Sequence, residues 1–144
     1  MRRLKDHCAA NPDQFKNTPL FLLRNLSRGR GIGFFEAGNF YPDFILWRID
    51  GDKQRITFVD PKGIRHLSWA NEAKLDFHQT IQDVEARMGD ANISLRSFIV
   101  SVTSADEMAL HWGVTRADMA ARNILFDEDE HYVRTLVKAS VPGA

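Results

Sequence analysis

The sequence predicts an α/β (α+β) domain in which a central mixed sheet of about four to five strands is flanked by helices. Two apolar runs, Phe44–Ile49 and Ile56–Val59, flank a polar turn that contains Asp50-Gly51, and this pattern predicts a β-hairpin. Apolar residues at helical spacing lead up to Met88, and a further apolar strand follows at Ser94–Thr103. Runs of predicted strands next to predicted helices in the sequence favour a sheet that is covered by helices.

Length and charge restrict the possible classes of protein. The 144 residues predict one domain at 18–144, preceded at 1–17 by a polar lead-in or the tail of an upstream domain. The 19 basic and 19 acidic side chains balance, which argues against a globally basic nucleic-acid binder but not against a local basic patch. Cys8 is the single cysteine, so no intrachain disulfide forms and a reducing, cytoplasmic location is expected. The sequence shows neither a signal peptide nor a membrane span.

The first elements are predicted from helix-capping and apolar patterns. Thr18 as N-cap and Pro19 at the first helical position predict a helix whose body is Leu20–Leu26. Ile32–Phe35 is then expected to form the first strand.

The loop between these two elements carries Gly29, Gly31 and Gly33 and admits two interpretations. It is either a basic loop in which Arg28 or Arg30 contacts phosphates, or a connector whose glycines adopt positive φ. Its spacing matches neither a dinucleotide-binding fingerprint nor a P-loop.

A helix is predicted from about Asn71 to Met88. Its core face is predicted to carry Phe77, Ile81, Val84 and Met88. A neighbouring polar stripe of Lys74, His78 and Gln82 is either a solvated face, which we favour, or a face that touches substrate. After the strand at 94–103 we expect helices at 104–112, capped by Ser104 with Glu107, and at 115–122, capped by Thr115, then an extended piece at 123–126 and a last helix at 129–139.

The predicted hairpin brings Asp43, Asp60 and Lys62 together at the end that lies away from its turn. A two-residue bend at Gly51-Asp52 pairs Asp50 with Lys53, which places Asp43 opposite Asp60. A bend one residue earlier leaves the two carboxylates diagonal neighbours. Alternation along the strand places Asp60 and Lys62 on the same face.

Two apposed carboxylates repel each other unless a cation lies between them, which indicates a site for a hard divalent ion such as Mg²⁺. Glu36, at the end of the strand expected at 32–35, is either a third carboxylate at this metal or a solvated strand end.

These residues also carry a resemblance. Pro42-Asp43, a strand–turn–strand and Asp60-Pro61-Lys62 resemble the active-site signature of the PD-(D/E)xK nuclease superfamily. Over roughly residues 18–135, the wider sequence is similar to the nuclease-like C-terminal region of DEAD/DEAH-box helicases and type III restriction subunits. The resemblance implies a restriction-endonuclease-like core and an endonuclease that hydrolyses phosphodiester bonds of DNA with Mg²⁺ or Mn²⁺.

The resemblance also implies roles for individual residues. Asp43 and Asp60 would hold the metal with the Pro61 carbonyl, with Glu36 as a possible further ligand, and Lys62 would position water or stabilise the transition state. Proline at position 61 departs from the family pattern, so we expect the strand to end there or to lie at an edge. The residues expected to contact nucleic acid are Arg24, Arg28, Arg30, Arg65, Lys74 and His78.

Three functions remain open from the sequence. The first is a nuclease domain that, as the resemblance implies, acts with a helicase or ATPase domain or subunit; the sequence has no P-loop with which to hydrolyse ATP itself. The second is a catalytically silent nucleic-acid-binding or docking module with a nuclease fold. The third is a structural domain in which Asp60 and Lys62 form a solvated charge pair. DNA and RNA are not distinguished by any residue pattern.

Overall fold

The computed structural model describes residues 1–26, 30–34 and 37–142. The elements, in chain order, are α1 (Arg2–Ala10), the 3₁₀-helix η1 (Pro12–Phe15), β1 (Leu20–Arg24), β2 (Phe44–Asp50), β3 (Lys53–Lys62), α2 (Phe77–Met88), β4 (Ile93–Ser101), α3 (Ala105–Trp112), α4 (Arg116–Ala121), β5 (Ile124–Phe126) and α5 (Tyr132–Ala139).

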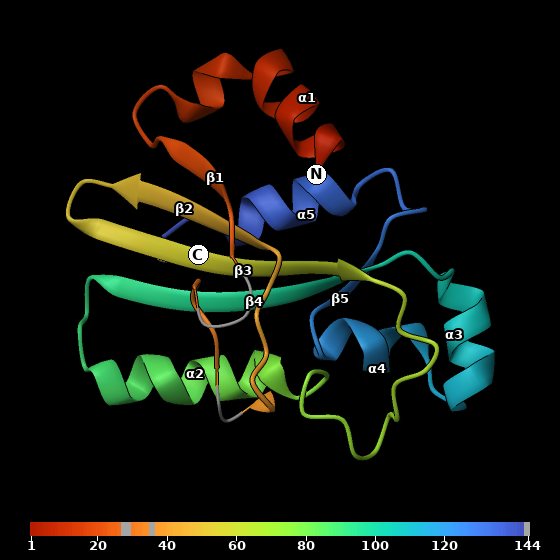
Figure 1. The fold of residues 1–144 in the computed structure, drawn as a ribbon. Helices are drawn as coiled ribbons and strands as arrows, with labels where there is room; N and C mark the ends of the chain where they lie inside the picture. Colours follow the sequence, from red (N-terminus) through yellow and green to blue (C-terminus); the bar gives the residue numbers. More distant parts are fainter. Residues whose placement is uncertain (27–29, 35–36, 143–144) are drawn as a thin grey trace.

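The five strands form one mixed sheet in the order β1-β2-β3-β4-β5 (Figure 1). The pairs β1–β2 and β2–β3 are antiparallel, whereas the pairs β3–β4 and β4–β5 are parallel. The parallel connections pass through α2 and through α3 and α4, as parallel strands require a crossover. The predicted fold class is therefore confirmed.

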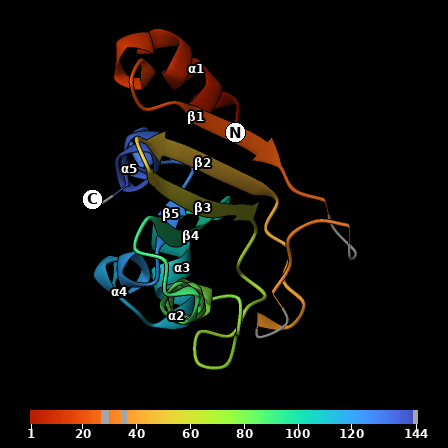
Figure 2. The same ribbon diagram turned by 90° about the vertical axis from the view of Figure 1, so that its left-hand side faces the viewer.

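Helices cover both faces of the sheet (Figures 1 and 2). α1 and α5 lie on one face, where Leu4 of α1 is 1% exposed and packs with Leu46, Val59 and Leu136. α2, α3 and α4 lie on the other face. That second face carries two core clusters, one around Phe58, Phe77 and Ile81 and one around Ile99 and Met108.

The hairpin forms in the predicted register. Asp50 pairs with Lys53 and Phe44 pairs with Val59, so the bend lies at Gly51-Asp52. Gly51 has φ of 57°, a left-handed conformation that costs glycine little.

The helix predicted at Leu20–Leu26 is wrong, because Leu20–Arg24 forms the edge strand β1. Along this segment Leu20 and Leu22 are partly buried while Phe21 and Leu23 are exposed, which is the period-two alternation of a strand. Five residues are too few for a stable helix without tertiary support, and hydrogen bonding to β2 outweighs the Thr18-Pro19 capping signal.

The strand predicted at Ile32–Phe35 is also wrong over its described residues. Phe34 makes only an isolated antiparallel bridge with Phe40, because the chain turns back through Gly38 and Asn39, which both have positive φ. Phe35 lies outside the described residues.

The described glycines of the 29–33 loop do not adopt the positive φ expected of a connector. They are required for close approach instead, since a Cβ at Gly31 would collide with the Leu26 carbonyl oxygen and one at Gly33 with the Tyr41 ring. The Asn25 side chain closes the loop by donating to the carbonyl oxygens of Ile32 (2.7 Å) and Pro42 (2.9 Å).

The later elements follow the prediction with shifted ends. α2 begins at Phe77 rather than near Asn71, because residues 72–76 form tight turns in which the N–H groups of Leu75 and Asp76 donate to the Glu72 carbonyl. Met88, predicted to face the core, is 49% exposed in the last turn of α2. The helices capped by Ser104 and Thr115, the strand at Ile124–Phe126 and the terminal helix are all present.

Candidate metal and phosphate site

The candidate site lies where β2 begins and β3 ends. Asp43 immediately precedes β2, whose first pair with β3 is Phe44–Val59, and the Asp43 N–H donates to Asp60 Oδ1 at an N···O distance of 3.3 Å. This contact between the Asp43 backbone and the Asp60 side chain confirms the prediction that the two residues meet at this end of the hairpin. The Asn25 N–H donates to the Asp43 carbonyl oxygen (2.8 Å), so β1 also fixes the position of Asp43.

Asp60 and Lys62 form an ion pair that is largely removed from solvent. Their side chains are 7% and 20% exposed, respectively, and Lys62 Nζ contacts Asp60 Oδ2. Because both side chains are largely withdrawn from water, this is not the solvated charge pair expected of a purely structural domain.

Lys62 is the titratable group that its surroundings perturb most clearly. Burial lowers the pKa of Lys62 to about 8, and the nearby charge of Lys74 contributes to this change, while the charges of Asp43 and Glu72 oppose it. Lys62 Nζ also lies 4.8 Å from the centroid of the Phe40 ring, a cation–π contact that holds the ammonium group in place.

A polar hollow of about 320 Å³ opens above these groups. Its walls are Gly38, Asn39, Phe40, Tyr41, Asp43, Asp60, Pro61, Lys62 and Lys74. It lies at the carboxyl ends of the parallel strands β3 and β4, the end at which open α/β sheets generally bind ligands.

Pro61 fits the sheet because β3 has an open side at this point. β2 begins at Phe44, opposite Val59, so beyond Asp60 the strand is paired only with β4. The missing proline N–H therefore removes no hydrogen bond to β2, and the prediction that the strand would lie at an edge at Pro61 is confirmed.

The residues predicted to contact nucleic acid are only partly brought together. Lys74 lines the hollow, and His78 lies next to Lys74 with Nδ1 2.9 Å from the Leu75 carbonyl oxygen. Arg65 is ion-paired with Glu107 at the surface (2.7 Å). Arg30 is exposed.

Arg24 lies on the opposite face of the sheet from Asp60. It pairs with Phe44, whose side chain packs with the α1 and α5 cluster, whereas Asp60 follows Phe58 on the α2 face. Arg28 and Glu36 lie outside the described residues.

The polar stripe predicted on the helix at 71–88 does not form one continuous surface. Lys74 precedes α2 and faces the hollow, while the Gln82 amide donates to the Leu95 carbonyl oxygen (2.9 Å) and so binds α2 to β4. Gln82 therefore has a structural role.

Two residues near the site were not identified from the sequence. Phe40 covers Lys62, and Glu72 adds a negative charge close to it. The Gly38-Asn39 turn signal immediately before Phe40 could have indicated that this aromatic ring folds back, but the position of Glu72 depends on the loop after β3.

Within residues 1–26, 30–34 and 37–142, no group of three or more His, Cys, Asp or Glu side chains gathers in a way that could hold a metal ion. None of the helices in the described part of the chain is long and apolar enough to cross a membrane. No family model, curated protein or solved structure shows a significant match to this chain.

Proposed function

We propose that this chain is a metal-dependent nuclease domain that hydrolyses phosphodiester bonds of DNA. The observation that carries the proposal is the buried carboxylate of Asp60, which lies beside Asp43, pairs with a lysine and borders an open polar hollow. Perturbed titratable groups that converge in a concave site are the usual features of a catalytic centre.

The residues fit a Mg²⁺ or Mn²⁺ ion. Asp60 Oδ2 is a buried acceptor whose contact is the Lys62 ammonium group, and Asp43 adds a second carboxylate-bearing residue to the lining of the same hollow. These two side chains, with the Pro61 carbonyl, would hold the ion, since hard cations in phosphate-processing sites use one or two carboxylates. A bound ion supplies Lewis acidity and lowers the pKa of a coordinated water.

The lysines supply positive charge for the substrate. With a pKa of about 8, Lys62 is mainly protonated at neutral pH and can stabilise negative charge on the phosphoryl oxygens. Lys74 borders the same hollow and adds a second cation for the phosphate backbone. Phe40 packs over Lys62 and limits access of water to its ammonium group.

The proposed biological setting is a helicase- or restriction-type system, in which a separate ATPase domain or subunit delivers the DNA. Only the resemblance of residues 18–135 to such C-terminal regions supports this part of the proposal.

A catalytically silent nucleic-acid-binding module is the second candidate. It is favoured because, among the residues that the structure describes, no group of three or more His, Cys, Asp or Glu side chains that could hold a metal ion is present. In this case Asp43 and Asp60 would bind no divalent ion at physiological concentration.

The test combines cleavage with direct metal binding. Purified protein is incubated with plasmid, linear and single-stranded DNA and with RNA, in Mg²⁺ and separately in Mn²⁺, and metal binding is measured by calorimetry. Asp60→Asn keeps the shape of the side chain, removes one negative charge and should abolish both metal binding and cleavage. Asp52→Asn makes the same change at the exposed hairpin turn and should affect neither.

The result separates the two candidates. Metal binding and cleavage of DNA, both lost in Asp60→Asn, support the nuclease. Nucleic-acid binding without metal binding or cleavage supports the silent module. Equal cleavage by wild type and Asp60→Asn would show that the site is wrongly assigned.

A further inference from the structure

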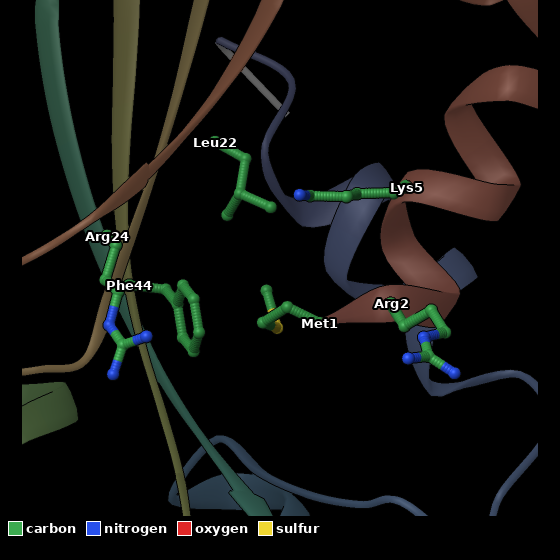
Figure 3. Close-up of a pocket in the computed structure, with 6 residues that line it drawn as sticks. All are labelled: Met1, Arg2, Lys5, Leu22, Arg24 and Phe44. Carbon is green, nitrogen blue, oxygen red and sulfur yellow. The ribbon is translucent and has the colours of Figure 1, made fainter.

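A second hollow lies at the same end of the sheet as the candidate site, on the opposite face (Figure 3). It has a volume of about 430 Å³ and lies between the first turns of α1 and the adjoining ends of β1 and β2. We call it the α1 pocket. It is lined by Met1, Arg2, Lys5, Leu22, Arg24 and Phe44.

The α1 pocket is lined by three positively charged side chains. Arg2, Lys5 and Arg24 are exposed, and in the described part of the chain none of them makes an ion pair or side-chain hydrogen bond. Elsewhere, Arg65, Arg96, Arg116 and Arg122 each pair with a carboxylate.

No acidic residue is among those that line the pocket. An anion bound in this hollow would therefore be attracted by the positive side chains around it.

The interior of the α1 pocket is apolar. Figure 3 shows the Met1 side chain directed toward the Phe44 ring, and Lys5 extending from α1 toward Leu22. Met1, Leu22 and Phe44 all pack against the core cluster beneath α1 and α5, so these surfaces have fixed positions. A ligand that satisfies this pocket combines a negative charge with a flat or apolar group.

The α1 pocket begins one residue from the candidate metal site. Asp43 and Phe44 are consecutive, and their side chains point to opposite faces of the sheet. Hydrogen bonds from Asn25 to Asp43 (2.8 Å) and to Pro42 (2.9 Å) fix the backbone between the two hollows.

We propose that the α1 pocket binds a nucleotide of a single nucleic-acid strand, with Lys5 and Arg24 on its phosphates and its base against Phe44. This inference rests on the proposed nuclease function, and it adds a strand-holding site beside the catalytic one. Basic grooves with an aromatic surface are the general means by which proteins hold single strands without reading sequence. The aromatic floor and the adjacent phosphate site favour a nucleic-acid strand over an acidic peptide.

The test measures binding without cleavage. The affinity of a dye-labelled 20-nucleotide oligothymidylate is followed by fluorescence anisotropy in EDTA, over a series of salt concentrations. The double variant Lys5→Gln/Arg24→Gln should weaken binding at least tenfold. It should also reduce the magnitude of the slope of log affinity against log salt concentration by about 1.4, because each phosphate neutralised on a single strand contributes about 0.7. Phe44→Leu keeps an apolar side chain in the core and should weaken binding about tenfold through loss of stacking, with its salt slope unchanged.

The matched control is Lys16→Gln/Lys53→Gln. It removes the same charge from two exposed lysines at the opposite end of the sheet and should leave affinity nearly unchanged. Circular dichroism and urea denaturation establish that each variant is folded before its affinity is interpreted.

The possible outcomes separate this inference from the proposed nuclease function. Absence of oligonucleotide binding by the wild type, or equal losses in the pocket and control variants, would overturn the α1 pocket assignment even if the protein cleaves DNA. If the wild type shows no cleavage and only the pocket variants lose oligonucleotide binding, the result would support the α1 pocket and overturn the proposed nuclease function. A polyglutamate peptide or anionic phosphatidylserine vesicles that bind more tightly than the oligonucleotide, with the same dependence on Phe44, would also overturn the proposal.

Discussion

At the scale of single residues, Lys62 connects most of what is unusual in this molecule. It pairs with a buried carboxylate, lies against an aromatic ring and has a pKa lowered to about 8. A lysine placed in this way has lost hydration that only a bound anion or a fixed carboxylate can replace.

Removing the charge of Lys62 should slow the proposed chemistry without removing the metal. Lys62→Ala should retain Mg²⁺ binding in calorimetry, because Asp43 and Asp60 remain, while cleavage should fall about 10²–10³-fold with the loss of one placed cation. Added Mn²⁺ should not restore the rate. Loss of metal binding in Lys62→Ala would instead give Lys62 a role in positioning Asp60.

The lowered pKa of Lys62 also predicts how stability depends on pH. Because the folded-state pKa of about 8 lies below the ordinary value of 10.5, the unfolded chain binds more protons between these two pH values. The free energy of unfolding of the wild type should therefore rise with pH across this window relative to that of Lys62→Met. Urea denaturation of both proteins at several pH values from 7.5 to 10.5 measures the difference, and a constant difference would contradict the assignment.

At the scale of elements, short segments depend on their neighbours as much as on their own sequence. β1 carries the signals of a helix start yet pairs with β2, whereas α4, with six residues, begins at the Thr115 cap that the sequence predicts, and Asp118 completes a capping box there. In α4 the Thr115 hydroxyl accepts from the Asp118 N–H (3.1 Å), and the Asp118 carboxylate accepts from the Thr115 N–H (2.8 Å).

The capping box of α4 should make a measurable contribution to stability. Thr115→Ala removes the hydroxyl acceptor and should lower the free energy of unfolding by about 1 kcal/mol. Thr115→Ser keeps the oxygen and should lie close to the wild type in the same chemical denaturation experiment. If Thr115→Ala and Thr115→Ser have the same free energy of unfolding, the hydroxyl group of the cap makes no measurable contribution to stability.

At the scale of the whole molecule, each of the two layers of helices covers one face of the sheet. α2, α3 and α4 bury the face on which Asp60 and Lys62 lie, and α1 and α5 bury the other. Buried arginines strengthen the second layer, since Arg48 donates to the Val137 carbonyl oxygen (3.4 Å) and Arg55 to that of Ala139 (2.8 Å), near the carboxyl end of α5.

The contribution of α1 can be tested at Leu4. This side chain is 1% exposed among Leu46, Val59 and Leu136, so Leu4→Ala should lower the free energy of unfolding by about 2–5 kcal/mol. Asp6→Ala, at an exposed position of the same helix, should change it by less than about 0.5 kcal/mol. An effect of Leu4→Ala as small as that of Asp6→Ala would show that residues 1–17 are a lead-in to the domain, as the sequence predicts.

The sequence alone was sufficient for the hairpin and the residues that it brings together. The alternation of apolar residues and the Asp-Gly turn determine the register, and register determines that Asp43 meets Asp60, because one slip would move every side chain to the other face. Helix caps at Ser104 and Thr115 are equally local, and they were also predicted.

Only the tertiary structure decided the features that depend on residues far apart in the chain. Leu20–Arg24 is a strand because β2 offers it hydrogen bonds, and Phe40 covers Lys62 because the 37–42 segment folds back over the sheet. The α1 pocket brings Lys5 and Arg24 together from two separate elements. Local patterns report which conformation a segment can adopt, but burial, pairing and the convergence of charge arise from packing between segments, which no short stretch of sequence contains.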